Sequence, residues 1–200
     1  MIISASRRTD IPSYYSEWII NRIKEGFVCV RNPMNPHQVS RITLSPEVVD
    51  CIVFWTKNPA PMLERMDELS SYPYYFQYTL TGYGRDVECN LPNKKEVLIP
   101  AFQSLAEKIG NNRVVWRYDP ILFNEVYTPE YHLNAFRQIA EALNGYTDQC
   151  VISFVDTYAK NKASMKALGT YELSRVELLA FTRELCRTAN ANGIRVVSCA

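Results

Sequence analysis

Histidine is scarce in this 200-residue sequence, which contains only His37 and His132. Imidazole is the commonest side-chain ligand of protein-bound metal ions, so this scarcity argues against a histidine-rich metallohydrolase. Cysteine is less scarce, but none of the six cysteines lies within the short spacing of a CxxC-type metal knuckle. The sequence therefore predicts no metal site in this chain, and on its own it should hold no metal-based cofactor.

Three further absences limit the class of protein. No stretch approaches the roughly 18 uninterrupted apolar residues of a membrane span. The formal net charge is only +1, which gives no global electrostatic case for nucleic-acid binding and leaves room for a local basic groove. The N-terminus enters a predicted strand at once, with no space for a signal peptide. We expect a cytoplasmic protein, with Cys29, Cys51 and Cys150 as buried, reduced thiols inside apolar strands.

Apolar strand-like runs alternate with helix-like segments along the whole chain. The expected strands cover residues 2–4, 27–30, 51–55, 74–80, 114–116, 150–155 and 194–198, and residues 38–44 suggest an extra half-exposed strand or hairpin arm. Helices are expected over residues 14–25 and 61–69, up to Ile109, after Thr128-Pro129, and from the Ser174/Glu177 capping pair.

This alternation predicts a single α/β domain over residues 1–200 with mostly parallel strands. A TIM-barrel-like or partial (β/α) barrel is favoured over an open, doubly wound sheet. The last predicted strand has no closing helix after it, which suggests that the sequence is a fragment that lacks a C-terminal region.

A burst of polar residues follows nearly every predicted strand. Because the carboxyl ends of parallel strands lie on one rim, we expect these residues to converge. The planar guanidinium of arginine can donate two hydrogen bonds to a carboxylate or phosphate. The aspartates and the lysine can transfer protons or stabilise charge. The candidate ligand-binding residues are Ser6, Arg7, Arg8, Thr9, Arg31, Asn58 and Arg117, and the candidate catalytic residues are Asp10, Lys57, Asp119 and Asp156. Six of these, namely Ser6, Arg7, Asp10, Lys57, Arg117 and Asp156, are expected to share one cavity.

Structural interpretations of the same residues stay open. Arg7, Arg8 and Asp10 could form an ion-pair network that anchors the first loop. Arg117 and Asp119 could form a local salt bridge before Pro120. Six aromatic residues are interpreted mainly as core or inter-layer packing, namely Tyr14, Tyr15, Tyr74, Tyr75, Tyr78 and Trp116.

Four motifs resemble the uncharacterised bacterial family DUF1848. They are SASRRTDIP at residues 4–12, FWTKNP at 54–59, WRYDP at 116–120 and ISFVD at 152–156, so the resemblance spans essentially the whole chain. Members of that family carry a C-terminal cysteine motif like that of radical S-adenosylmethionine enzymes, where three thiolates hold an iron–sulfur cluster. The resemblance thus implies that a longer family member could bind a cluster and S-adenosylmethionine, although this chain has no such triplet.

Three functional hypotheses follow. The leading one is a barrel-like domain whose rim binds an anionic small molecule or nucleotide, and which in the full-length family would be the scaffold of an iron–sulfur, radical-type enzyme. The second is a non-radical hydrolase or lyase that uses the aspartates, Lys57 and the arginines. The third is a non-catalytic module that binds a ligand or nucleic acid. The substrate and the oligomeric state stay open.

Overall fold

The computed structural model describes the whole chain except residues 7, 157, 159–160 and 200. These residues fall into two compact units, Met1–Gln77 and Tyr78–Ala200, which are described in turn. The single domain expected over residues 1–200 stays a prediction. None of the helices within the described residues is long and apolar enough to cross a membrane.

The chain is a mixed α/β protein, and within the described residues its larger sheet has six strands in the order β1-β4-β5-β6-β7-β8. The pairs β1–β4, β6–β7 and β7–β8 are parallel. This confirms the α/β class and the dominance of parallel strands. The described strands do not close into a barrel, because β1 and β8 stand at the two ends of the order.

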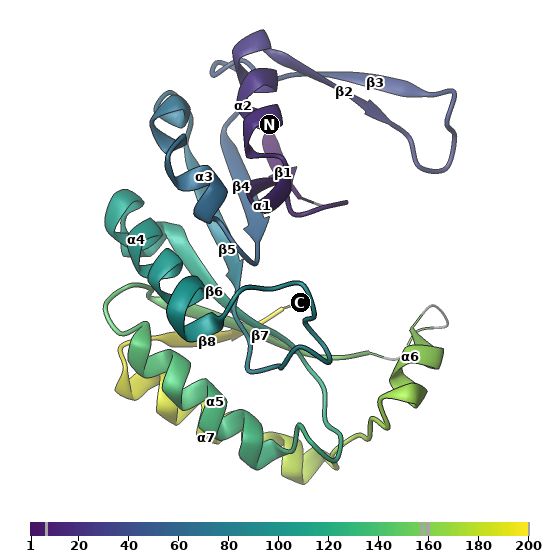
Figure 1. Cartoon of the computed structure of the whole chain (residues 1–200), viewed down its shortest axis with the longest axis vertical. Helices are drawn as coiled ribbons and strands as arrows, with labels where there is room; N and C mark the ends of the chain where they lie inside the picture. The colour runs from purple at the N-terminus through teal and green to yellow at the C-terminus, as the bar shows by residue number, and fades with distance from the viewer. Residues whose placement is uncertain (7, 157, 159–160, 200) are drawn as a thin grey trace. The chain divides into compact units, whose positions relative to one another are not determined.

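The first unit contains a short apolar strand, a helical pair and a projecting hairpin (Figure 1). Its elements are β1 (Ile2–Ala5), α1 (Ile11–Tyr14), α2 (Ser16–Glu25), β2 (Phe27–Arg31), β3 (Val39–Thr43), β4 (Cys51–Thr56), α3 (Ala60–Leu63), the 3-10 helix η1 (Met66–Leu69) and the first part of β5 (Tyr74–Thr79). Phe54 of β4 stacks on Phe76 of β5 with ring centroids 5.0 Å apart. Both rings are fully buried and form the centre of this unit's core.

The second unit consists of long amphipathic helices and parallel strands. Its elements are the remainder of β5, the π-helix η2 (Lys94–Leu98), α4 (Ile99–Ile109), the 3-10 helix η3 (Asn111–Arg113), β6 (Val114–Ile121), α5 (Pro129–Ala142), β7 (Gln149–Phe154), α6 (Lys162–Ala167), α7 (Arg175–Ala191) and β8 (Arg195–Ser198). Helices α5 and α7 lie side by side (Figure 1). Trp116 of β6 is fully buried and stacks on Phe136 of α5 at 4.6 Å.

Several helix boundaries confirm the sequence predictions. Thr128 caps α5 by accepting from the Tyr131 N–H, and Pro129 is the first residue of that helix. Ser174 and Glu177 form the predicted capping box of α7. Gly110 follows the last residue of α4.

Other predictions were wrong in detail. The helix expected over residues 14–25 is two helices, α1 and α2, that meet at Tyr15. The helix expected over 61–69 ends at Leu63 and is followed by a 3-10 turn. Helix α6 lies in a stretch for which no helix was predicted. Cys29 is exposed rather than buried.

The strand predicted at residues 27–30 does not join the parallel sheet. It is β2, and it pairs antiparallel with β3, with Phe27 opposite Thr43 and Arg31 opposite Val39. The suggested hairpin arm over residues 38–44 is thereby confirmed. Residues 32–38 connect β2 to β3, so β2 forms its main-chain hydrogen bonds with the strand that follows it in the sequence. Arg31 therefore lies at the end of a hairpin strand, not of a parallel one.

Candidate ligand site

The loop after β1 is held in place by the Asp10 carboxylate. Its Oδ1 accepts from the Ser13 N–H at 3.0 Å, which caps α1, and its Oδ2 accepts from the Lys57 N–H at 2.6 Å. Ser13 Oγ in turn donates to the Asn58 carbonyl at 2.7 Å. The loop after β1 is therefore tied to the loop after β4, as the common position of these residues at strand ends predicted.

Two other predicted ligand-binding residues of this loop region also bond to the main chain. Ser6, whose φ of 90° lies in the left-handed region, accepts from the Ile11 N–H through Oγ at 3.1 Å. Asn58 Oδ1 accepts from the Ala60 N–H at 3.2 Å at the start of α3. The polar atoms of Ser6, Asp10 and Asn58 thus shape the loops, and this geometry favours a positioning role for all three.

Arg8 does not pair with Asp10. Its Nη2 donates to the main-chain carbonyl of Arg31 at 2.6 Å, and within the described part of the chain its guanidinium contacts no carboxylate. The ion-pair network proposed for the first loop is therefore wrong for Arg8. Arg7 lies outside the described residues.

A groove of about 750 Å³ opens beside Arg8, within the first unit. It is called the β1–β2 groove here, because consecutive residues of β1 and of β2 line it together with α2. Its apolar wall includes Ile3, Ala5, Ile19, Val28, Ile42 and Leu44. Tyr15, between α1 and α2, and Trp18 of α2 also line it, and both side chains are partly exposed to solvent.

The polar lining of the groove is cationic. Arg8, Thr9 and Arg31 all line it, so three of the predicted ligand-binding residues lie at one site. No aspartate or glutamate side chain is present among its described lining residues. Neither guanidinium has an acidic partner in the parts of the chain that the structure describes. Two cations without a matched acid beside an apolar cavity form an arrangement suited to an anion with an apolar body.

Lys57 and Asp156 lie elsewhere. Lys57 is half-buried at the end of β4 and does not line the groove. Asp156 is exposed in the second unit, where its Oδ2 accepts from the Tyr158 hydroxyl at 3.0 Å and thereby raises the pKa of Tyr158. The shared cavity expected for residues of both units stays a prediction.

Arg117 and Asp119 form the local salt bridge that was one of the two interpretations. Arg117 Nε donates to Asp119 Oδ1 at 2.9 Å, and Nη2 donates to Oδ2. Both side chains are nearly buried, and Ser153 Oγ lies 3.4 Å from Asp119 Oδ2. Burial alone would lower the pKa of Arg117, but the hydrogen bonds and the charge interactions with Asp119 and Cys199 together outweigh it, so the pKa of Arg117 is raised. The two charges neutralise each other, so Arg117 has little capacity left to bind an external anion.

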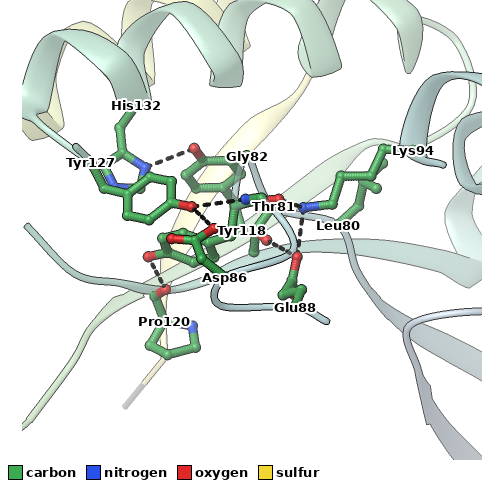
Figure 2. A network of polar contacts seen from close by, with 12 residues as sticks. Leu80, Thr81, Gly82, Asp86, Glu88, Lys94, Tyr118, Pro120, Tyr127 and His132 are labelled. Atoms are coloured by element: carbon green, nitrogen blue, oxygen red, sulfur yellow. Dashed lines mark hydrogen bonds and ion pairs between the residues drawn. The ribbon is translucent and has the colours of Figure 1, made fainter. Parts of the chain in front are cut away.

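A second polar cluster in the second unit surrounds the loop after β5 (Figure 2). Tyr83 Oη accepts from the Leu122 N–H and donates to the Pro120 carbonyl, both at 2.8 Å. Tyr127 Oη accepts from the Gly84 N–H at 3.0 Å and donates to Asp86. Burial, together with the hydrogen bond to Asp86, raises the pKa of Tyr127 to about 12.

The other polar side chains of this cluster also have hydrogen-bond or ion-pair partners. His132 Nε2 faces the Leu122 carbonyl at 2.9 Å, which can only accept, so Nε2 carries the proton and Nδ1 accepts from the Tyr118 hydroxyl at 2.8 Å. Glu88 accepts from Thr81 Oγ1 at 2.9 Å and pairs with Lys94 at 2.6 Å. Sequence reasoning did not group these residues, because their chain separations show no motif. The cluster forms a scaffold that holds the loop.

The described residues do not supply the ligand set of an iron–sulfur cluster. They contain no group of three or more His, Cys, Asp or Glu side chains placed to hold a metal ion. Such a cluster needs three or four thiolates gathered at one point.

The chain was compared with models of known protein families and with curated proteins. The family model described as a domain of unknown function (DUF1848) matches residues 2–200. No curated protein matches the chain.

Proposed function

The chain belongs to the DUF1848 family, and from its site we propose that it binds an anionic small molecule in the β1–β2 groove. One observation carries the proposal: Arg8 and Arg31 line an apolar cavity, and its described lining residues include no acidic side chain. Apolar cavities of about 300–1,000 Å³ with a few placed polar groups are typical ligand sites. The volume of about 750 Å³ also accommodates a nucleotide.

The strand order supports a partial barrel as the scaffold. The order follows the sequence without a reversal, whereas a doubly wound sheet reverses at a switch point. The groove then lies near the carboxyl end of β1, where barrel proteins build their sites. A radical-type reaction is not part of the proposal, because the described residues do not gather three thiolates.

Calorimetric titration of Arg8→Gln against the unmodified chain tests the proposal. The probes are inorganic phosphate, butyrate and adenosine monophosphate. A charge-assisted hydrogen bond contributes roughly 1.5–3 kcal/mol, so we expect the best-binding probe to lose about one to two decades of affinity.

Arg41→Gln is the matched control. Arg41 lies on the same hairpin and packs over Phe27, but it does not line the groove. Its loss should leave affinity within about twofold, the difference expected for a distant surface charge at physiological salt. Equal losses in both variants, or no binding of any probe, would contradict the proposed function.

A further inference from the structure

The β1–β2 groove lies between two strand edges that carry no partner strand. Strand β1 pairs with β4 alone and ends the strand order, and β2 pairs with β3 alone. Five consecutive residues from 1 to 5 and four from 28 to 31 line the groove. A row of consecutive residues from each strand means that main chain, as well as side chains, faces the cavity.

The hydrogen-bond pattern shows which main-chain groups of β1 face outward. The Met1 carbonyl accepts from the Asp50 N–H, so Met1 faces the β4 side. Since direction alternates along a strand, Ile3 and Ala5 face β4 as well, and the N–H and C=O groups of Ile2 and Ser4 point to the free edge. No hydrogen bond to these groups is found among the described residues.

The same reasoning applies to β2. The Gly26 carbonyl accepts from Leu44 N–H, and the Asn32 N–H donates to the Gln38 carbonyl, so these residues face β3. Alternation then directs Cys29 and Arg31 to the opposite edge. The bond from Arg8 Nη2 to the Arg31 carbonyl confirms that this edge faces the loop after β1.

We infer that the ligand of the β1–β2 groove is a short extended peptide with a free C-terminal carboxylate, which binds by strand addition. The inference rests on the proposed function and specifies its ligand class. Exposed strand edges recognise extended peptides through main-chain hydrogen bonds, and pockets beside them select side chains.

Charge and polarity set the direction of the peptide. A strand added parallel to β1 places its C-terminus near Arg8 and Arg31, where a carboxylate meets two guanidinium groups. Its apolar side chains meet the aliphatic wall. The four residues of β1 span about 13 Å at roughly 3.3 Å per residue, so the groove suits a segment of four to five residues.

The test uses acetyl-Val-Thr-Val-Thr-Val with a free carboxylate, its C-terminal amide, and a version N-methylated at its second and fourth residues, titrated by calorimetry. We expect the free acid to bind at least tenfold more tightly than either analogue and than butyrate. Butyrate binding with no preference for the peptide, or no effect of N-methylation, overturns the inference and leaves the proposed function standing. If no anion and no peptide binds, both the proposed function and this inference are wrong.

Protein variants test the edges separately. Cys29→Pro removes an N–H from the free edge of β2, whereas Val39→Pro removes one from the opposite, outer edge of the hairpin, since the Arg31–Val39 pair faces away from the ladder. Cys29→Pro should weaken peptide binding at least tenfold and Val39→Pro should leave it unchanged, with thermal unfolding confirming that both fold. If Cys29→Pro does not fold, the N-methylated peptide alone decides. A different outcome would be that the chain binds no peptide but forms a dimer, and that Cys29→Pro abolishes this dimer. That result would assign the groove to a second copy of the chain and overturn the inference.

Discussion

At the residue scale, Asp10 is a carboxylate whose two oxygens both accept hydrogen bonds from main-chain N–H groups. One of these N–H groups comes from α1 and one from the end of β4. The sequence pattern predicted Asp10 as a catalytic candidate. Its contacts instead favour a role in positioning the loop that carries Arg8.

Asp10→Ala should therefore destabilise the chain rather than only reduce ligand binding. Loss of a helix N-cap costs about 0.5–2 kcal/mol, and a second amide loses its acceptor as well, so we expect about 2–3 kcal/mol in urea unfolding. Asp10→Asn keeps one acceptor oxygen and should lose about half as much. A loss below about 0.5 kcal/mol for Asp10→Ala would show that the loop does not depend on this carboxylate.

Arg117 and Asp119 illustrate what sequence can and cannot decide at this scale. Their spacing before Pro120 was compatible with a rim site and with a salt bridge, and the side-chain geometry selects the salt bridge. Charge type and spacing are visible in sequence. Which charges neutralise one another depends on rotamers and burial, which one sequence does not contain.

At the element scale, Gly82 allows the loop after β5 to approach α5. A Cβ at this position would lie 2.6 Å from Ala135 Cβ and 3.1 Å from the Tyr118 hydroxyl oxygen. Gly82→Ala should therefore cost about 1–3 kcal/mol of unfolding free energy through overpacking.

Ala135→Gly tests this contact in a double-mutant cycle. Alone it should cost about 1 kcal/mol, the usual helix penalty of glycine. Combined with Gly82→Ala it should recover part of the loss, because the added methyl then has space. Strictly additive unfolding free energies for the two substitutions would contradict a direct steric contact.

The elements differ in how well sequence predicted them. The starts of α5 and α7 were predicted correctly because their capping residues act locally. Strand β2 was assigned to the wrong sheet, because its apolar run is compatible with either partner and pairing is a non-local choice. The β1–β2 groove follows from that pairing, so its candidate residues were predicted but its walls were not.

At the scale of the whole molecule, the buried His132 should make folding depend on pH. Burial is the main cause that lowers the pKa of His132 below its usual value near 6.5, so the unfolded chain binds this proton more readily than the folded chain. The stabilising effect is complete above about pH 6.5 and is lost as the pH falls towards the lowered pKa.

Urea unfolding between pH 7.5 and pH 5 measures this dependence. We expect the unfolding free energy to fall with decreasing pH, and His132→Gln to reduce the slope in this range even though it lowers stability overall. His37→Gln is the matched control, since His37 is exposed on the hairpin connection. An unchanged slope in His132→Gln would assign the pH dependence to other groups.

Trp18 gives the β1–β2 groove an optical consequence. Its indole lines the groove and is 43% exposed, whereas Trp116 is fully buried in the second unit. Indole emission shifts to shorter wavelength when water leaves the ring, so a ligand that covers Trp18 should shift the emission to shorter wavelength, while Trp116 contributes a constant background. Trp55, whose indole donates to Ser4 Oγ at 3.2 Å, is also close to the groove, so Trp55→Phe isolates the response of Trp18. The unlabelled chain thus carries its own fluorescent reporter of whether this groove is occupied.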